Sequence, residues 1–201
     1  FLTGITGFIG REFAHAYLTK LEDTRIIALV RAKGAKTNLA GSKLKKLAAF
    51  IESGRLVLVE GDITDPQFVE RIGLKHIPSS GITEFWHIAG STDFDESKRQ
   101  FTHMTNVLGT RTALKLASKV SGLTRFFHFS TAYVQHKGRG MQKVYEDVSP
   151  PLGADFANNP YEESKAEAEH EVRNSSLPWI ILRPGIVLGH SQNISHHFTL
   201  L

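Results

Sequence analysis

The 201-residue sequence predicts an α/β fold, a doubly wound parallel sheet with helices on both faces. Short apolar runs alternate with amphipathic segments, and this alternation implies parallel βαβ units with right-handed crossovers. The apolar runs are continuous, as strands are when helices cover both faces of their sheet. A glycine-rich turn also joins the first apolar run to the first amphipathic segment. Together these three observations lead to the predicted fold class.

Six short apolar runs are the expected strands. After Phe1-Leu2 they are RIIALV (25–30), RLVLVE (55–60), EFWHIA (84–89), RFFHFS (125–130) and WIILRP (179–184). The first expected helix covers residues 8–21, where apolar side chains recur at helical spacing. Further helices are expected over 43–52, 66–73, 96–120 and 161–174. Residues 33–42 are polar and contain glycine, and 138–160 are rich in loop-forming residues, so both stretches predict loops.

The composition describes a globular protein with a hydrophobic core, since 41% of residues are hydrophobic and 22% are charged. The net charge of +4 suits an anionic small ligand but is too weak to indicate nucleic acid. Without cysteine the chain has no disulfide and no thiolate metal site. We find no apolar run long enough to span a membrane and no signal peptide, and we expect a cytoplasmic protein.

The stretch TGITGFIG, residues 3–10, predicts a turn that holds a dinucleotide. Gly4 allows the tight turn, Gly7 lets the backbone approach a pyrophosphate, and Gly10 lets the helix pack on the strand. Free amides at the helix start then face the phosphates. The alternative is an ordinary flexible turn, because the spacing differs from the G-x-G-x-x-G of many dehydrogenases. We expect cofactor contacts from Thr3, Gly4, Thr6, Gly7, Phe8, Ile9 and Gly10.

Basic residues at the end of the second strand favour NADP over NAD. Arg31 and Lys33 stand where an acidic residue would bind the ribose 2′-hydroxyl of NAD, and a guanidinium matches a 2′-phosphate. Arg11 is expected to add a second positive charge. The alternative is that these are solvated surface residues.

After the third strand, Asp62 is placed to accept a hydrogen bond from the adenine amino group, with Ile63 beside it. The alternative is a helix cap, in which Asp62 or Thr64 serves a helix that opens near Pro66.

Tyr161 and Lys165 lie four residues apart, so a helix places them on one face. A nearby ammonium stabilises tyrosinate and lowers the pKa of the phenol, which could then exchange a proton with a substrate oxygen. Ser130 and Thr131 end the fifth strand, where a hydroxyl could bind a substrate carbonyl. The alternative for these hydroxyls is a hydrogen bond to local backbone.

Other residue patterns in the sequence indicate no metal site and no hydrolase motif. The ten histidines show no H-E-x-x-H spacing, and we expect no metal site. His87 and His128 lie in apolar strands and are expected to be hydrogen-bonded core residues. Glutamates at 162, 163, 167, 169 and 171 predict the water-facing side of their helix. No G-x-S-x-G turn is present, which argues against a hydrolase.

The motifs together resemble the extended short-chain dehydrogenase/reductase family. They are TGITGFIG (3–10), GDIT (61–64), HIAGS (87–91), NVLGT (106–110), FSTAYV (129–134), YEESK (161–165) and RPGIVLG (183–189), in the family's order. Within that family LTGITGFIG, LVRAKG, STAYV and NPYEESKAEAE look most similar to the thioester-reductase and fatty acyl-CoA reductase branch.

The resemblance implies a role for each matching residue. Tyr161 would be the general acid/base, and Lys165 would lower its pKa and bind the nicotinamide ribose. Thr131, rather than Ser130, would orient the substrate oxygen. The residues implied to border the nicotinamide or support the site are Ala89, Gly90, Asn106, Pro184 and Gly185.

The implied reaction is NADPH-dependent reduction of an acyl thioester, carried by coenzyme A or a carrier protein, to an aldehyde or alcohol. Two alternatives remain: an NAD-dependent nucleotide-sugar epimerase or dehydratase, against which Arg31 counts, and a non-catalytic dinucleotide-binding sensor. The presence of Tyr161, Lys165 and Thr131 counts against a sensor. Related proteins pair the helices expected at 96–120 and 161–174 in homodimers, so a homodimer is a further expectation.

The resemblance also implies how the chain divides. Residues 1–190 would form the NADP-binding Rossmann domain, with a truncated first strand because only three residues precede Gly4 and strands usually have about five. Residues 191–201 would begin a C-terminal substrate-binding portion that is largely missing. The family usually has Ala-Ala where this chain has Ala89-Gly90.

Overall fold

The computed structural model describes residues 1–31, 44–65, 67–68, 80–135 and 145–189. Six parallel strands form one sheet in the order β3-β2-β1-β4-β5-β6. The strands are β1 (Leu2–Thr3), β2 (Ile26–Val30), β3 (Leu56–Glu60), β4 (Glu84–His87), β5 (Arg125–Phe129) and β6 (Trp179–Leu182). The strand order reverses between β1 and β4, the position at which open α/β sheets bind ligands. The predicted doubly wound fold and its six strands are confirmed.

The strands end slightly earlier than the apolar runs. β4 stops at His87 and β6 at Leu182, although the runs continue to 89 and 184. Ile88, Ala89 and Pro184 leave the sheet because they line cavities at its carboxyl edge, which are described below.

Helices follow the predicted order with finer divisions. They are α1 (Phe8–Lys20), η1 (Lys45–Leu47), α3 (Ala48–Glu52), η3 (Glu96–Lys98), α5 (Arg99–His103), the π-helical η4 (Met104–Leu108), α6 (Gly109–Ala117), η5 (Ala132–Gln135), η6 (Ala154–Phe156) and α7 (Pro160–Arg173). The single helix expected over 96–120 is therefore a series with a π turn in its middle. Most of the helix expected at 66–73 and the loop at 33–42 lie outside the described residues.

α7 begins one residue earlier than predicted because Asn159 caps it. The Asn159 side chain accepts a hydrogen bond from the Glu162 amide at 3.0 Å, and Pro160 occupies the first helical turn, where its missing N–H costs nothing.

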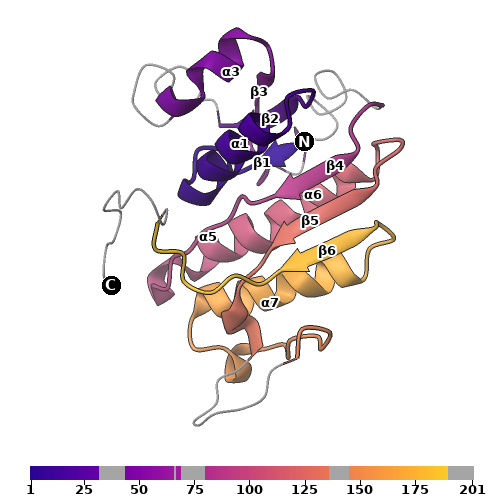
Figure 1. The fold of residues 1–201 in the computed structure, drawn as a ribbon. Helices are drawn as coiled ribbons and strands as arrows, with labels where there is room; N and C mark the ends of the chain where they lie inside the picture. The colour runs from indigo at the N-terminus through magenta and orange to yellow at the C-terminus, as the bar shows by residue number, and fades with distance from the viewer. Residues whose placement is uncertain (32–43, 66, 69–79, 136–144, 190–201) are drawn as a thin grey trace.

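Two clusters of buried side chains show that both faces of the sheet are covered. On one face α1 contributes Ala14 and Leu18, which pack with Ala28 and Leu56 of the sheet. On the other face, helices α6 and α7 cover β4 and β5; that cluster includes Phe85, Ala113, Leu116, Phe126 and Val172. Figure 1 shows α5, α6 and α7 together behind β4, β5 and β6. Among the described helices, none is both long and apolar enough to cross a bilayer.

Candidate cofactor and catalytic site

The glycine turn between β1 and α1 has the backbone geometry that a phosphate-binding turn needs. Gly4 has a φ of 82°, and its carbonyl accepts the Gly7 amide at 2.9 Å. A Cβ on Gly10 would lie 2.2 Å from the Gly4 oxygen, so only glycine lets α1 approach β1 this closely. Gly7 is the N-cap residue of α1, and because glycine has no side chain it supplies no capping hydrogen bond to the first turn, where helices commonly bind anions.

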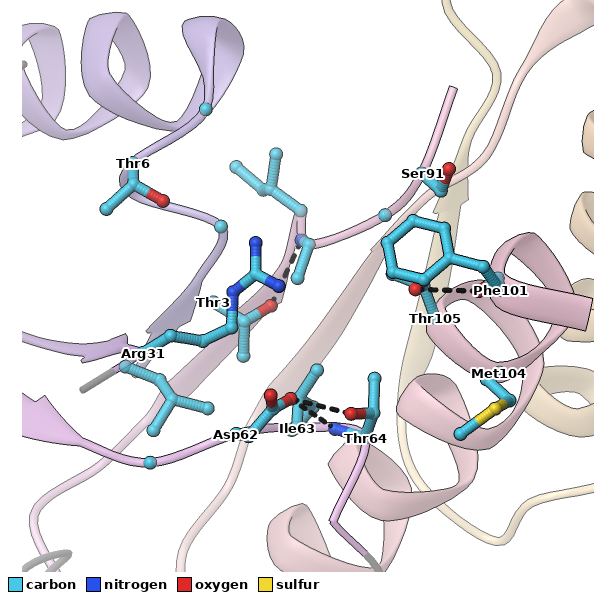
Figure 2. Close-up of a pocket in the computed structure, with 17 residues that line it drawn as sticks. Thr3, Thr6, Arg31, Asp62, Ile63, Thr64, Ser91, Phe101, Met104 and Thr105 are labelled. Atoms are coloured by element: carbon cyan, nitrogen blue, oxygen red, sulfur yellow. Dashed lines mark hydrogen bonds between the residues drawn. The ribbon is translucent and has the colours of Figure 1, made fainter. Parts of the chain in front are cut away.

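A cavity of about 490 Å³ lies beside this turn, at the carboxyl edge of β1, β2 and β4. Figure 2 shows Thr6 in the glycine turn on one side and Phe101, Met104 and Thr105 on the helix opposite. Nine residues predicted to bind the cofactor line it: Thr3, Gly4, Thr6, Gly7, Arg31, Asp62, Ile63, Ala89 and Gly90. Phe101, Met104 and Thr105 were missed, because nothing in a helical pattern tells which turn faces a ligand.

Arg31 and Asp62 come from the ends of neighbouring strands and both line this cavity. The Arg31 side chain is exposed, and in Figure 2 it reaches across the cavity toward Thr3. Asp62 Oδ1 accepts the Thr64 amide at 2.9 Å and the Thr64 hydroxyl at 2.8 Å, so it orders its own turn as well. Both interpretations of Asp62, cavity lining and local capping, therefore hold in the geometry.

The remaining predicted phosphate contacts are less well placed. Arg11 lies on the first turn of α1 but is not among the side chains that line this cavity or the second one below. Lys33 lies outside the described residues. Of the basic residues singled out for NADP, the structure brings Arg31 to the cavity.

A second cavity of about 510 Å³ adjoins the first and holds the predicted catalytic residues. Gly4, Gly7, Ile88, Gly90 and Ser91 line both cavities. The second is further lined by the predicted residues Phe8, Ile9, Gly10, Ser130, Thr131, Tyr161, Lys165, Pro184 and Gly185, together with Phe94, Tyr133, Ile186 and Val187, which were not predicted. These four large hydrophobic side chains are all exposed, so the mouth of the cavity is apolar.

Tyr161 shares a hydrogen bond with the Thr131 side chain, which favours Thr131 over Ser130 as the hydroxyl beside the phenol. Burial raises the pKa of Tyr161 above its ordinary value, and the Thr131 hydrogen bond opposes this only in part. Lys165 is not among the groups that shift this pKa, so the expected lowering of the Tyr161 pKa by Lys165 remains a prediction. Ser130 is buried, and its hydroxyl has no hydrogen-bond partner within the described part of the chain.

Lys165 is fully inside the protein, with 5% of its surface exposed. Its Nζ donates a hydrogen bond to the Phe129 carbonyl at the end of β5. Burial lowers the pKa of Lys165 to about 8, while the nearby Glu169 carboxylate acts to raise it. The ammonium is thus close to its titration point at physiological pH.

Asn106 lines neither of the two cavities, although it was predicted to belong to the cofactor site. Its side chain accepts the Ser91 amide at 2.7 Å and donates to the Ser91 carbonyl at 3.0 Å. It also donates to the Ser164 hydroxyl at 2.8 Å, beside Lys165 in α7. Asn106 therefore supports the cavity wall from behind, as a buttress between β4 and α7.

Comparison with known proteins now identifies the family. The family model described as "Male sterility protein" matches residues 2–198. This chain belongs to the male sterility protein family. Within it, the chain is an extended short-chain dehydrogenase/reductase of the branch that contains fatty acyl-CoA reductases and thioester reductases, as its motifs predicted.

The chain is also similar to individual proteins of known name. Fatty acyl-CoA reductase 1 of Gallus gallus is 26% identical over 222 residues, which cover 92% of this chain and 42% of the relative. The terminal R domain from the myxalamid PKS-NRPS biosynthetic pathway is 30% identical, with a TM-score of 0.71, over 94% of this chain and 49% of that one. The chain spans about two fifths of the length of the curated reductases that it matches.

The fold is shared more widely than the family. UDP-glucuronic acid 4-epimerase from Bacillus cereus, solved with NAD, has a TM-score of 0.65 at 23% identity, over 93% of this chain and 56% of that one. At this identity the likeness shows the fold alone.

Two histidines of this family member lie in the core behind the cavities. His87 bonds through both ring nitrogens, to Thr3 and Thr110, as expected of a satisfied core residue. For His128 that expectation is wrong: the ring is fully buried, and neither of its nitrogens has a partner among the described residues. The described residues hold no cluster of three metal-ligating side chains.

A buried ion pair beneath the site was also missed. Glu169 was predicted to face water, but its carboxylate is fully buried and receives two hydrogen bonds from Arg183, at 2.9 and 2.6 Å. Glu162 is likewise buried, at the cap of α7. Arg183 precedes Pro184 and Gly185, so the ion pair fixes the cavity wall after β6 against α7.

Proposed function

We propose that this chain is the NADP-binding and catalytic part of a reductase that acts on acyl thioesters, bound to coenzyme A or to a carrier protein. The observation that carries the proposal is the meeting of Tyr161, Lys165 and Thr131 in a cavity that adjoins the glycine turn at the sheet's switch point. The relatives named as fatty acyl-CoA reductase and terminal R domain support this class of substrate.

The residues present fit a dinucleotide. A glycine turn at the N-terminus of α1 adjoins a cavity lined by one basic and one acidic side chain, Arg31 and Asp62. The N-terminus of α1 would hold the pyrophosphate, Asp62 the adenine, and Gly90 with Pro184 would border the redox ring. When bound, the cofactor supplies the hydride, and the protein supplies orientation and charge.

Tyr161 would hold the proton that the substrate oxygen needs. Its raised pKa keeps the phenol protonated, which suits a donor in the direction of reduction. Thr131 has one hydroxyl hydrogen, so it would give up its hydrogen bond to the phenol and become the second donor to the substrate oxygen. Lys165 would place positive charge below the phenol, so that tyrosinate is stabilised once the proton has left.

The role of Tyr161 is tested by Tyr161→Phe, with consumption of NADPH in the presence of a long-chain acyl-CoA as the readout. Turnover is expected to fall at least about 100-fold, in the range lost when a general acid is removed, while the Kd for NADPH changes little. Tyr133→Phe is the matched control, because Tyr133 also lines the cavity but lies at its exposed mouth. Unchanged turnover in Tyr161→Phe would refute the assignment.

Preference for NADPH is proposed on Arg31. Replacing Arg31 by Leu is expected to weaken NADPH binding at least about tenfold, because one charge-assisted contact to a phosphate is lost, and to leave NADH binding nearly unchanged. Isothermal titration with both cofactors measures this. Equal losses for NADPH and NADH would mean that Arg31 does not contact the 2′-phosphate, and wild-type preference for NADH would favour the epimerase alternative.

The homodimer remains a prediction. The helices expected to pair across a two-fold axis already pair within the chain, through the ion pairs Arg99–Glu163 and Arg111–Glu171 and a hydrogen bond between His103 and Glu167. Light scattering after size-exclusion chromatography measures the mass directly, and a mass of one chain would refute the dimer.

A further inference from the structure

A chain of hydrogen bonds crosses the core between β1 and α6, behind the first cavity. Thr3 Oγ1 lies 2.8 Å from His87 Nδ1, and Thr110 Oγ1 lies 3.1 Å from the other ring nitrogen, Nε2. All three side chains are almost completely buried. They come from β1, β4 and α6, so the bonds join elements that are far apart in sequence.

The direction of each bond follows from its neighbours. Thr110 Oγ1 lies 2.6 Å from the Asn106 carbonyl, which has no hydrogen, so the Thr110 hydroxyl must donate there. His87 Nε2 must then carry the hydrogen that Thr110 accepts. Because burial lowers the pKa of His87 to about 3, the ring is neutral and Nδ1 accepts from Thr3. Thr3 Oγ1 in turn accepts the Ala89 amide at 3.2 Å, the dashed line beside Thr3 in Figure 2.

Both ends of this chain reach one short segment of the cavity wall. At the start, the Ala89 amide donates to Thr3. At the other end, the Asn106 side chain accepts a hydrogen bond from the Ser91 amide and donates one to the Ser91 carbonyl. Gly90 lies between them and lines both cavities, and a Cβ there would lie 3.1 Å from Asn106 Oδ1. The segment 89–91 is therefore held on both sides of the glycine.

We infer that His87 and Thr110 are positioning residues, which fix segment 89–91 and the Asn106 buttress through a one-directional hydrogen-bond chain. The inference rests on the proposed function, because that function makes Gly90 a wall of the cofactor site. It explains a buried histidine at the end of β4, because neutral imidazole accepts on one ring nitrogen and donates from the other across this distance.

Thr110→Val tests the inference, because valine keeps the shape and removes the hydroxyl. Thr112→Val is the matched control: Thr112 is also buried in α6 and also donates to a carbonyl four residues earlier, Leu108 at 3.0 Å, but is not part of the chain. Thr110→Ser restores the hydroxyl. Amide hydrogen exchange at Ser91 is the readout, since that amide is bound by Asn106.

We expect exchange at Ser91 to quicken at least about tenfold in Thr110→Val and to stay near wild type in Thr110→Ser and Thr112→Val, since a looser buttress opens locally more often. The Kd for NADP⁺ is expected to rise about threefold or more in Thr110→Val alone. Equal changes in both valine variants, or none in either, would overturn the inference.

The tautomer of His87 gives a second test that needs no variant. Nitrogen NMR of the wild-type protein is expected to show a neutral ring protonated on Nε2, and a ring protonated on Nδ1 would overturn the inference. These measurements use the folded chain without thioester. A wild type that fails to reduce acyl-CoA would therefore refute the proposed function while leaving this test readable.

Discussion

At the scale of single residues, Lys165 shows how the site balances charge against burial. Its ammonium lines the same cavity as Tyr161 and donates to a main-chain carbonyl, yet the side chain is almost completely buried. The cost of that burial appears as a pKa near 8, below the ordinary 10.5. The role proposed for Lys165 needs the cation, whereas burial shifts the group toward its neutral form.

The lowered pKa of Lys165 predicts how stability depends on pH. Between pH 8 and 10.5 the unfolded chain keeps a proton that the folded chain has lost, so the free energy of unfolding rises with pH in this window. Lys165→Met is expected to be more stable than wild type at pH 7. That advantage should shrink by roughly 2 kcal/mol between about pH 8 and pH 9.5, at about 1.4 kcal/mol per unit.

Urea unfolding of both proteins at the two pH values measures this difference. A constant advantage of Lys165→Met across the window would show that Lys165 does not titrate there.

At the scale of elements, α7 carries the proposed catalytic pair and a buried carboxylate that anchors the helix, all at four-residue spacing. Tyr161, Lys165 and Glu169 follow one another at four-residue spacing. Arg183 binds the Glu169 carboxylate with two nitrogens and also donates to the Glu146 and Val148 carbonyls. One guanidinium thus joins α7, the end of β6 and the segment before α7.

Loss of this anchor is expected to be costly. Glu169→Gln should reduce the free energy of unfolding by about 3 kcal/mol, because it leaves the Arg183 guanidinium buried without its counter-ion. Glu171→Gln is the control on the same helix: its ion pair with Arg111 is partly exposed and should contribute less than about 1 kcal/mol. Urea unfolding at neutral pH measures the loss of stability in each variant. Similar losses would mean that the buried ion pair contributes no more to stability than the partly exposed one.

The sequence allowed residues with a fixed spacing or a fixed backbone role to be predicted, and the structure shows why others could not be. Short local motifs were enough to predict the positions of Gly4, Gly10, Tyr161 and Lys165. Arg183 and Glu169 are both charged and look like surface residues, since their pairing depends on how β6 packs on α7. Phe94 and Ile186 line the cavity from loops after strands, and no periodic pattern marks those positions.

At the scale of the whole molecule, two buried histidines make the fold sensitive to acid. Burial lowers the pKa of His87 to about 3, and it lowers the pKa of His128 well below the ordinary value. As pH falls below 6.5 the unfolded chain takes up protons that the folded chain cannot. The free energy of unfolding therefore falls by about 1.4 kcal/mol per pH unit for each histidine.

His128→Leu separates the two contributions. It removes the ring whose nitrogens have no partner among the described residues, so the pH dependence between about pH 6 and pH 5 should lose one histidine's share, roughly 1.4 kcal/mol per unit. Urea unfolding at both pH values measures the slope for the variant and for wild type. Identical slopes would mean that His128 remains neutral in the unfolded chain as well, or charged in both states.

The π turn η4 determines the directions in which its side chains point. Its wider loop lets Met104 and Thr105 face the first cavity while Asn106 points into the protein. Deleting one residue between 104 and 108 would restore regular α winding, with successive side chains about 100° apart, and so would change the directions of the side chains within this turn. Substitutions within 104–108 would keep the number of residues in the turn and therefore its winding. We expect natural variants to tolerate substitution in this segment more readily than a change in its length.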